Sequence, residues 1–583
     1  MSERWRSGLA RGAALFVVLA TAKVLVCVLR SMDGAPIGLW RIVTACREEA
    51  IVTLAFTLVA AALPRFIRVA YFALAAIAAL SIPVTRVFAS PLTASMREAT
   101  GGAIADSIRE NVSPSNVLAI LFVAVLAIVI ERNARFVRSV HALAIATAIL
   151  GYAAPPPTLA LHRDPVVALV STEIARRLPS SKEATESGEA VAAEDDPETR
   201  GLDLRYLAGA ARGRHVIWIV LESTGARYLA PYGNKVDPMP TLTRLASEGI
   251  VFDHAYAVYP ESIKGLYAML CSFAPAPHTP ARTYAANALP CRSIAETLKG
   301  EGYATALFHS GRFAYLGMDH VVRDRGYDVL ADAKTIGGKH ASSFGTDDMS
   351  TVKTVLARFD ERRADERLFI TYMPISGHHP YESPGEGPRP FGERTDFERY
   401  ESDLYRGDLA LAELVSGLRA RGLWNDTLFV IHGDHGEAFQ QHEGNFAHTL
   451  FAYDENIHVP LVVVAPGLVR GGMRARQLVS LLDVAPTIAE LVGAAPDARW
   501  QGISALHPEQ RVVRSFADHT SVKLALRTGR HKLVFDADTE RTELFDLVAD
   551  PGEQRPIDDR SRSSAYRADL ERWAASQRAL ASR

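Results

Sequence analysis

The strongest constraint in this sequence is a series of five apolar stretches before residue 160. Several of them approach the ~20 residues that a helix needs to cross a bilayer. A cleaved signal peptide would account only for the first, and the buried helices of a soluble core rarely follow one another five times with so few charges. We therefore expect an N-terminal all-α transmembrane bundle of five helices over residues 1–160. The stretches cover residues 10–30, 50–64 (which can borrow from 40–45), 69–85, 115–130 and 138–159.

Arginines in the short loops indicate how this bundle is oriented. With five spans, all of them lie on one side, which is expected to be cytoplasmic, so the chain after the fifth span lies outside. We expect a multi-pass protein of the cell inner (plasma) membrane with a periplasmic domain. The outer loop at 86–115 contains a mixed polar and apolar run, 92–108, that could lie in the interface as an amphipathic helix. The arginines are Arg4, Arg6, Arg11, Arg65, Arg68, Arg132, Arg135 and Arg138.

Residues 161–213 are expected to form a linker, because 176–200 is rich in Ser, Glu, Ala and Pro and has no apolar period. The formal net charge of the chain is only -2, with 64 basic and 66 acidic side chains. That balance argues against nucleic acid as a partner.

The chain has four cysteines and no CxxC pair, so a thiolate zinc site or an iron–sulfur cluster is not expected. Cys271 and Cys291 lie in the later part of the chain. A disulfide between them, in an oxidising compartment, and two buried free thiols are both consistent with the sequence.

After residue 214, short apolar runs alternate with amphipathic helical patterns. This alternation predicts an α/β domain over 214–583 with a mostly parallel, doubly wound central sheet. The expected strands are 215–221, 304–308, 368–373, 427–431 and 460–464, and helical patterns occur at 239–249 and 293–302.

Chemically useful side chains follow three of these strands. Glu222 ends the first, His378 and His379 follow the third, and Asp434 and His435 follow the fourth. Open parallel sheets carry their chemistry at the carboxyl ends of strands, so these groups are expected at one edge. Carboxylate and imidazole ligands suit Zn²⁺ or Mn²⁺, although a single acid after a strand is often only a solvated turn residue.

Five segments, in order, resemble the sulfatase group of the alkaline-phosphatase superfamily. With five spans in front, the chain is similar to lipoteichoic acid synthase-type phosphoglycerol transferases and to lipid A phosphoethanolamine transferases. The segments are LTRLASEGIVFDHAYA (242–257), GDHGE (433–437), IHVPLVVVAPG (457–467), SLLDVAPTIAELVG (480–493) and ELFDLVADPGEQ (543–554).

The resemblance implies one metal-held nucleophile downstream of the first acid. Sulfatases place a modified Cys or Ser within C/S-x-P-x-R, but this chain reads YPESIKGLYAMLCS at 259–272, without that context. Ser262 fits the position of the unmodified Thr of the transferases. Glu222–Ser223 offers one acid where sulfatases tend to carry paired aspartates.

Carried over residue by residue, Glu222, Asp434, His435 and Ser262 resemble the ligands of one divalent ion, Mn or Zn, with Mg or Ca as alternatives. Ser262 is also the implied nucleophile. The resemblance implies that His378 and His448 contact the substrate or transfer protons, with His379 and His442 as the competing choices. Lys264 would stabilise the serine alkoxide or a substrate oxygen, and the alternative for it is a solvated helix residue.

The resemblance implies a phosphoglycerol- or phosphoethanolamine-type transferase for the cell envelope. Membrane lipids would serve as anchor and donor, and an envelope glycan or lipid would be the acceptor. A membrane-anchored sulfatase or phosphodiesterase is the alternative, favoured by the sulfatase-like segment at 543–554. A non-catalytic envelope-assembly protein is a third hypothesis, opposed by the complete set of site residues.

Overall fold

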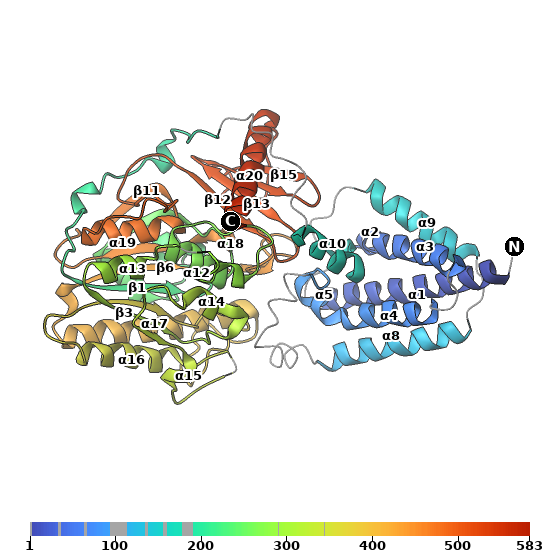
Figure 1. Ribbon diagram of the computed structural model, residues 1–583, viewed down its shortest axis with the longest axis horizontal. Coiled ribbons are helices and arrows are strands. Elements are labelled where there is room, and N and C mark those ends of the chain that lie inside the picture. Colours follow the sequence, from blue (N-terminus) through green and yellow to red (C-terminus); the bar gives the residue numbers. More distant parts are fainter. Residues whose placement is uncertain are drawn as a thin grey trace.

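The computed structural model describes residues 3–582 except 33–36, 63–66, 94–112, 134–137, 155–159, 178–189, 290 and 343. It contains an N-terminal helical bundle, at the right of Figure 1, and an α/β domain at the left, with the N-terminus at the far end of the bundle. Most of the run at 92–108, expected as an amphipathic helix, lies outside the described residues.

Each of the five apolar stretches contains a helix. Two segments, Trp5–Met32 and Pro114–Arg132, are long and apolar enough to cross a membrane by length and composition. The helices at the other three stretches are α3, α4 and α9, of 16, 14 and 16 residues. The bundle helices are α1 (Glu3–Met32), α2 (Leu39–Ala45), α3 (Arg47–Ala62), α4 (Ile67–Leu80), α5 (Ile82–Phe88), α8 (Pro114–Arg132) and α9 (Arg138–Ala153).

Helix α1 lies inside the bundle, and α8 shows how the outer helices pack around it. The side of α8 that faces inward is small, with Ala119, Val123 and Ala127 buried at a spacing of four residues. Small side chains allow close approach of helix backbones, as in membrane helix pairs. The outward side of α8 is large and apolar, with exposed side chains at Leu118, Leu121, Phe122, Val125, Ile128 and Val129.

The central sheet of the α/β domain has the strand order β11-β2-β10-β6-β1-β5-β3-β4. It is mixed: β1 pairs in parallel with β5 and β6, whereas β10 is antiparallel to β2 and β6. The strands are β1 (His215–Leu221), β2 (Ile250–Tyr256), β3 (Tyr303–His309), β4 (Val329–Ala331), β5 (Arg367–Met373), β6 (Thr427–Gly433), β9 (His458–Val459), β10 (Leu461–Val464) and β11 (Met473–Ser480).

Strand β1 lies between two helical layers and is buried along its whole length. Its side chains alternate between two cores, with Val216, Trp218 and Val220 in one and Ile217 and Ile219 in the other. This explains why the strand reads as a continuous apolar run rather than as an alternating pattern. The larger covering helices are α11 (Pro240–Glu248), α12 (Ser262–Cys271), α13 (Ile294–Gly300), α16 (Asp348–Asp360), α17 (Asp396–Ala420) and α19 (Val484–Val492).

A second, antiparallel sheet at the C-terminal end is absent from the sequence-based expectation. Its order is β12-β13-β14-β15, and helix α20 (Arg560–Ala581) packs on it. The strands, connected by short turns, are β12 (Val512–Ala517), β13 (Lys523–Thr528), β14 (His531–Asp536) and β15 (Arg541–Asp546).

Part of the segment expected as a linker is structured. Helix α10 (Pro165–Arg177) follows the bundle, and Leu204, Leu207 and Ala211 are buried in the core of the α/β domain. The backbone N–H of Val191 donates to Asp569 on α20 at 2.9 Å. The later part of this segment therefore follows the surface of the α/β domain.

Cys271 and Cys291 form a disulfide, which decides between the two readings left open by the sequence. The bond joins the last residue of α12 to the segment before α13, 20 residues later. Cys27 and Cys46 are buried free thiols in the bundle.

We expect removal of this disulfide by Cys291→Ala to lower the free energy of unfolding of the α/β domain by about 3 kcal/mol, because the bridge constrains the unfolded chain. Thermal unfolding of the full-length chain in detergent measures the loss. Thiol titration in denaturant gives the control: two thiols should react before reduction and four after it, and four at the outset would contradict the bridge.

Candidate active site

Three adjacent strand ends supply the polar groups, as the strand-end rule predicts. Strands β6, β1 and β5 are neighbours and parallel. Glu222 follows β1, and Asp434 and His435 follow β6. One ligand atom from each of these three residues lies within 4.8 Å of the others, and all three side chains are buried.

Ser262 lies against this group from another direction. It is the first residue of α12, and its N-cap is Glu261. The hydroxyl is 2.7 Å from Asp434 Oδ2, 3.0 Å from Glu222 Oε2 and 3.4 Å from His435 Nε2. The positive end of the α12 dipole favours negative charge on this oxygen. The four residues expected as metal ligands therefore meet at one point.

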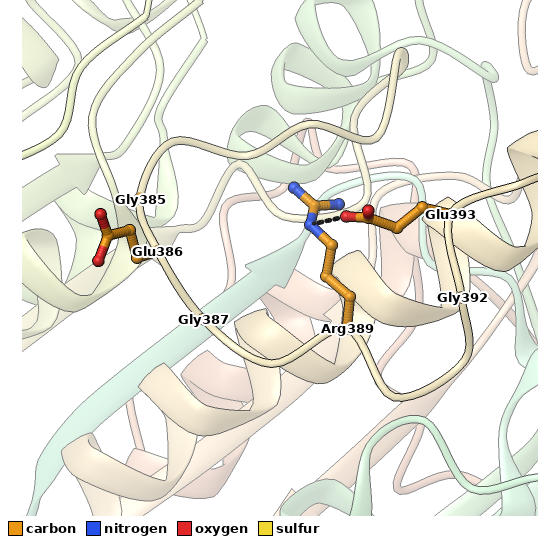
Figure 2. A pocket seen from close by; sticks show the side chains of 6 residues that line it. All are labelled: Gly385, Glu386, Gly387, Arg389, Gly392 and Glu393. Carbon is orange, nitrogen blue, oxygen red and sulfur yellow. Dashed lines mark ion pairs between the residues drawn. The ribbon is translucent and has the colours of Figure 1, made fainter.

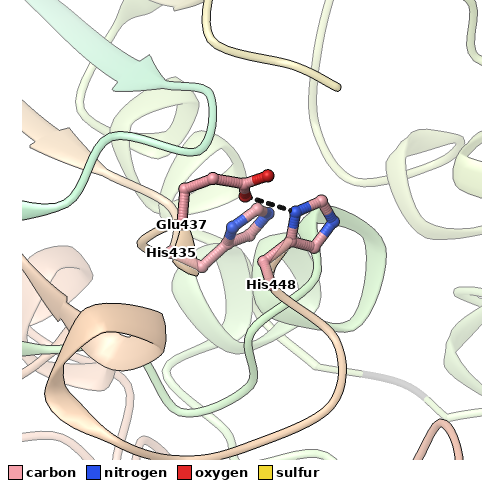
Figure 3. Close-up of side chains that lie close together, drawn as sticks. All are labelled: His435, Glu437 and His448. Atoms are coloured by element: carbon pink, nitrogen blue, oxygen red, sulfur yellow. Dashed lines mark hydrogen bonds and ion pairs between the residues drawn. The ribbon is translucent and has the colours of Figure 1, made fainter. Parts of the chain in front are cut away.

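His448 lies beside His435, with ring centroids 4.2 Å apart. Its Nδ1 is 2.7 Å from Glu437 Oε2, and Figure 3 shows the three side chains together. When Glu437 is ionised its oxygens only accept, so in that state Nδ1 carries the proton and Nε2 is left as an acceptor. Tyr381 donates its hydroxyl to the other oxygen of Glu437 at 2.5 Å. Glu437 thus fixes the orientation of His448.

The two candidate histidines after β5 have different surroundings. The His378 ring centroid is 6.4 Å from that of His448. His379 instead packs edge-on against Tyr381 and Phe446. Burial lowers the pKa of His379 to about 4. The geometry places His378 nearer to the group around Ser262.

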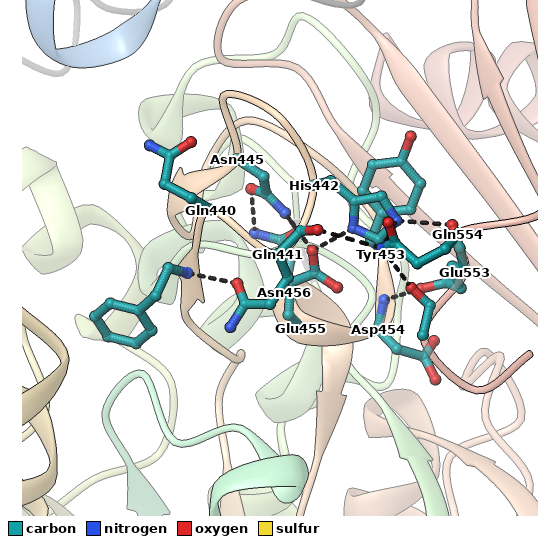
Figure 4. Close-up of polar contacts among 12 residues, drawn as sticks. Gln440, Gln441, His442, Asn445, Tyr453, Asp454, Glu455, Asn456, Glu553 and Gln554 are labelled. Atoms are coloured by element: carbon teal, nitrogen blue, oxygen red, sulfur yellow. Dashed lines mark hydrogen bonds and ion pairs between the residues drawn. The ribbon is translucent and has the colours of Figure 1, made fainter. Parts of the chain in front are cut away.

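His442 belongs to a different polar cluster, drawn in Figure 4. Its Nδ1 is 2.6 Å from Glu455 Oε1, and its Nε2 is 2.8 Å from the carbonyl oxygen of Glu553. The ring stacks on Tyr453 with centroids 3.7 Å apart. Both ring nitrogens are used within the protein, so the geometry favours His448 over His442 as the residue that faces a substrate.

Lys264 lies two residues after Ser262 but pairs with Asp518. Its Nζ is 2.9 and 3.0 Å from the two Asp518 oxygens. Among the described residues, no hydrogen bond or ion pair joins Lys264 to Ser262. A direct contact of Lys264 with the substrate stays a prediction.

A shallow cavity of about 520 Å³ lies on the loop after the two histidines. Figure 2 shows its rim, which is mainly glycine backbone together with the ion pair between Arg389 and Glu393 at 2.7 Å. None of the groups around Ser262 lines it. Its position therefore does not define the reaction centre.

Comparison with known proteins identifies the α/β domain. Residues 214–494 match the Sulfatase family, and residues 443–579 match the family described as N-sulphoglucosamine sulphohydrolase, C-terminal. The chain belongs to the sulfatase and alkaline-phosphatase superfamily. A solved alkaline-phosphatase superfamily protein from Vibrio parahaemolyticus has the same fold, with a TM-score of 0.54 and 19% identity, covering 68% of this chain and 94% of that one.

The proteins that are similar to this chain include both a sulfatase and a lipoteichoic acid synthase. The ulvan-active sulfatase of Formosa agariphila is 22% identical over 375 residues, which are 55% of this chain and 60% of that protein. Lipoteichoic acid synthase 2 of Bacillus subtilis is 23% identical over 346 residues, which are 55% of this chain and 52% of that protein. The chain thus matches about half the length of these curated relatives.

The residues around Ser262 fit the divalent metal that this superfamily typically uses. Two buried carboxylates close to each other repel unless a cation or a proton lies between them. The Nδ1 of His435 faces the carbonyl oxygen of Gly436 at 3.0 Å, so Nε2 turns its lone pair toward Glu222 and Asp434. Oxygen and imidazole donors in this arrangement suit Zn²⁺ or Mn²⁺.

Burial and neighbouring charges shift the pKa values of Glu222, His435 and His448. Burial, followed by the Asp434 carboxylate, raises the pKa of Glu222 to about 8. Burial lowers the pKa of His435, but the carboxylates of Asp434 and Glu222 outweigh it and raise the pKa overall. Burial and the imidazoles of His435 and His378 hold the pKa of His448 well below its usual value.

Sequence reasoning missed two residues of this region. Glu437 is fully buried beside His448, and burial raises its pKa to about 7. It stands within the GDHGE segment, but only the fold shows that it contacts His448. His309 ends β3, the strand next to β5. The strand-end rule applied to the run 304–308 would have found it.

We expect the metal-free protein to become less stable as pH rises between 4.5 and about 8. In that window folded Glu222 holds a proton that the unfolded chain releases, and His435, with its raised pKa, acts in the same direction. Added Mn²⁺ or Zn²⁺ should reverse the trend, because binding requires deprotonated ligands.

Thermal unfolding of the chelator-treated full-length chain, with and without metal, measures this effect. Glu222→Gln should flatten the pH dependence and reduce the stabilisation by metal. The same increase in midpoint for wild type and for Glu222→Gln/Asp434→Asn would contradict the metal site.

Proposed function

We propose that this protein is a membrane-bound, metal-dependent phosphotransferase of phosphoglycerol or phosphoethanolamine type, which uses Ser262 as its nucleophile. The observation that carries the proposal is the Ser262 hydroxyl, 2.7 Å from Asp434 and 3.0 Å from Glu222, which stands outside any C/S-x-P-x-R sequence. The similarity to lipoteichoic acid synthase 2 supports this choice.

In the proposed reaction, the Ser262 oxygen attacks the phosphorus of a phospholipid head group. A bond forms between Oγ and phosphorus, and the bond from phosphorus to the diacylglycerol oxygen breaks. An acceptor hydroxyl of an envelope glycan or lipid then attacks phosphorus and releases Ser262. A divalent ion such as Mn²⁺ or Zn²⁺, held by Glu222, Asp434 and His435, would lower the pKa of the serine hydroxyl and neutralise phosphoryl charge.

In the proposed mechanism, His448 transfers protons and His378 binds or orients the substrate. His448 keeps Nε2 unprotonated at neutral pH, because burial lowers its pKa and Glu437 holds its Nδ1 proton. It can accept the proton of the attacking hydroxyl or, once protonated, give one to the leaving alcohol. His378, whose pKa is also lowered by burial, is placed to bind or orient the substrate beside it.

The bundle supports a multi-pass membrane placement. Large apolar side chains are exposed on α3, α4, α8 and α9, as expected of a surface that meets lipid. Glu131 pairs with Arg68 at 2.8 Å and with Arg11 at 3.7 Å, so the ends of α1, α4 and α8 that carry these residues meet. The N-terminus of α1 points away from the α/β domain (Figure 1).

This arrangement agrees with a cytoplasmic basic end and a periplasmic α/β domain. The disulfide supports the same placement, since such bonds persist in oxidising compartments. An active site beside the outer leaflet is well placed for lipid head groups as donors.

A membrane-anchored sulfatase or phosphodiesterase is the second candidate. The match of residues 443–579 to the C-terminal part of N-sulphoglucosamine sulphohydrolase favours it. Two sequence features oppose a sulfatase: the formylglycine context is missing at Ser262, and Glu222 is followed by Ser223 instead of a second acid.

We expect a covalent phosphoglycerol or phosphoethanolamine adduct on Ser262 when the full-length chain in detergent is incubated with Mn²⁺ or Zn²⁺ and a fluorescent phospholipid. Phosphatidylglycerol, phosphatidylethanolamine and an aryl sulfate are tested separately, and peptide mass spectrometry locates the adduct. Ser262→Ala should lose the adduct and about 10³-fold or more of turnover.

Ser416→Ala, which removes an exposed hydroxyl on α17, is the matched control and should behave as wild type. Fast turnover of the aryl sulfate, with a modified residue in place of the serine, would replace the transferase assignment by a sulfatase.

A further inference from the structure

The turn that presents Ser262 is held on both sides by one carboxylate, that of Asp518. Before the serine, the Tyr259 hydroxyl donates to Asp518 Oδ1 at 2.6 Å. After it, Lys264 Nζ donates to both oxygens at 2.9 and 3.0 Å. The backbone N–H of His278 donates to Oδ2 at 2.6 Å. The Asp518 side chain is 0% exposed, so these contacts form without competition from water.

Asp518 comes from a different part of the molecule, directly after β12 of the C-terminal sheet. The chain before it runs along the segment that leads to Ser262. The N–H of Phe516 donates to the carbonyl of Val258 at 2.8 Å, and the Ser515 hydroxyl donates to that of Ala257 at 2.6 Å. The C-terminal sheet therefore braces the approach to the serine as well as the turn itself.

The residues after Asp518 are contacted from the N-terminal part of the chain. The Thr93 hydroxyl of the bundle donates to the carbonyl of His519 at 2.8 Å, and Arg163, which lies just before α10, donates to that of Thr520 at 3.4 Å. One short loop thus contacts the turn that carries Ser262 at its first residue, and the N-terminal part of the chain at the next two.

We propose that Asp518 is a positioning residue for Ser262, and that its ion pair with Lys264 fixes the direction of the serine hydroxyl relative to Glu222 and Asp434. This inference rests on the proposed function, in which Ser262 is the nucleophile. In this proposal Lys264 acts on Ser262 through the turn, and this role does not require contact with the substrate. It is the only described side chain after the serine within α12 that pairs with Asp518, so it sets the rotation of the first turn of that helix.

The geometry explains why a charged pair stands here. Charge-assisted hydrogen bonds are stronger than neutral ones, and here three donors, Tyr259, Lys264 and the N–H of His278, make four hydrogen bonds to one buried carboxylate. A misplacement of about 1 Å at a reacting atom costs about 100-fold in rate. Ser262 lies 2.7 Å from Asp434, so a shift of that size would break the contact.

The test compares Asp518→Asn, Lys264→Met and the double variant with wild type, all as full-length chains in detergent with Mn²⁺. The double variant guards against misfolding, because removing both members of a buried pair is tolerated better than stranding one charge. Asp569→Asn is the matched control, since Asp569 accepts from Arg514 of the same strand β12 at 2.6 Å, and its hydrogen bonds and ion pairs among the described residues include none with residues 259–264.

We expect kcat, measured with whichever fluorescent phospholipid or aryl sulfate gives the Ser262 adduct, to fall about 100-fold in Asp518→Asn with KM within threefold of wild type. The double variant should be no slower than the slower single variant, because all of them remove the same interaction. Asp569→Asn should keep kcat within threefold. A kcat of Asp518→Asn within threefold of wild type, or full additivity in the double variant, would overturn the proposal.

Hydrogen exchange provides a readout that needs no substrate. The amides of residues 261–266 should exchange about tenfold faster in Asp518→Asn, whereas their exchange should be unchanged in Asp569→Asn. Unchanged exchange in both would overturn the proposal. If wild type forms no adduct with any probe, the proposed function fails, while the exchange result still decides whether Asp518 holds the turn.

Discussion

The carboxylates of Glu222 and Asp434, buried within reach of one serine hydroxyl, are the constraint on which the rest of the α/β domain depends. Like charges at such a separation in a low-dielectric site are unstable unless a proton or a cation joins them. Their surroundings favour the cation. His435 turns its lone pair toward them, and Ser262 adds an oxygen at the positive end of a helix. The fold thus brings negative charges together in a buried site, and a divalent ion bound there would neutralise them.

Two separate β-sheets hold the residues around Ser262 in place. The parallel strands β6, β1 and β5 set the positions of the acids and the histidines, since their carboxyl ends meet at one edge. The antiparallel C-terminal sheet sets the position of the serine from the other side, through Asp518. Ser262, the proposed nucleophile, and the other candidate metal ligands are therefore supported by different sheets. The sulfatase-like segment at 543–554 begins within β15, the last strand of the C-terminal sheet. It therefore has a structural role in the sheet that supports Ser262.

The sequence allowed prediction of what depends on local pattern and sheet rules. Buried strand runs, followed by an acid or a histidine, located Glu222, Asp434 and His378, and the five apolar stretches located the bundle helices. It did not reveal partners distant in sequence. The ion pair of Lys264 with Asp518 could not be predicted, because the two residues are 254 positions apart in the sequence. The antiparallel C-terminal strands were not predicted, because an alternation of strands and helices gives no sign of a second sheet. The sequence left the pairing of Cys271 with Cys291 open, and the structure decides it.

The contacts between bundle and α/β domain have a kinetic consequence. Two short antiparallel strands, β7 (Ala438–Phe439) and β8 (Phe446–Ala447), precede His448. Arg41 of α2 pairs with Glu443 in the turn between them, and Thr93 donates to the loop after Asp518. In the proposed membrane placement, these ties keep the reaction centre at a fixed height above the bilayer. Its encounters with lipid then take place in two dimensions. Turnover should follow the mole fraction of donor in the surface, so that dilution with inert lipid slows the enzyme while dilution of the whole suspension does not.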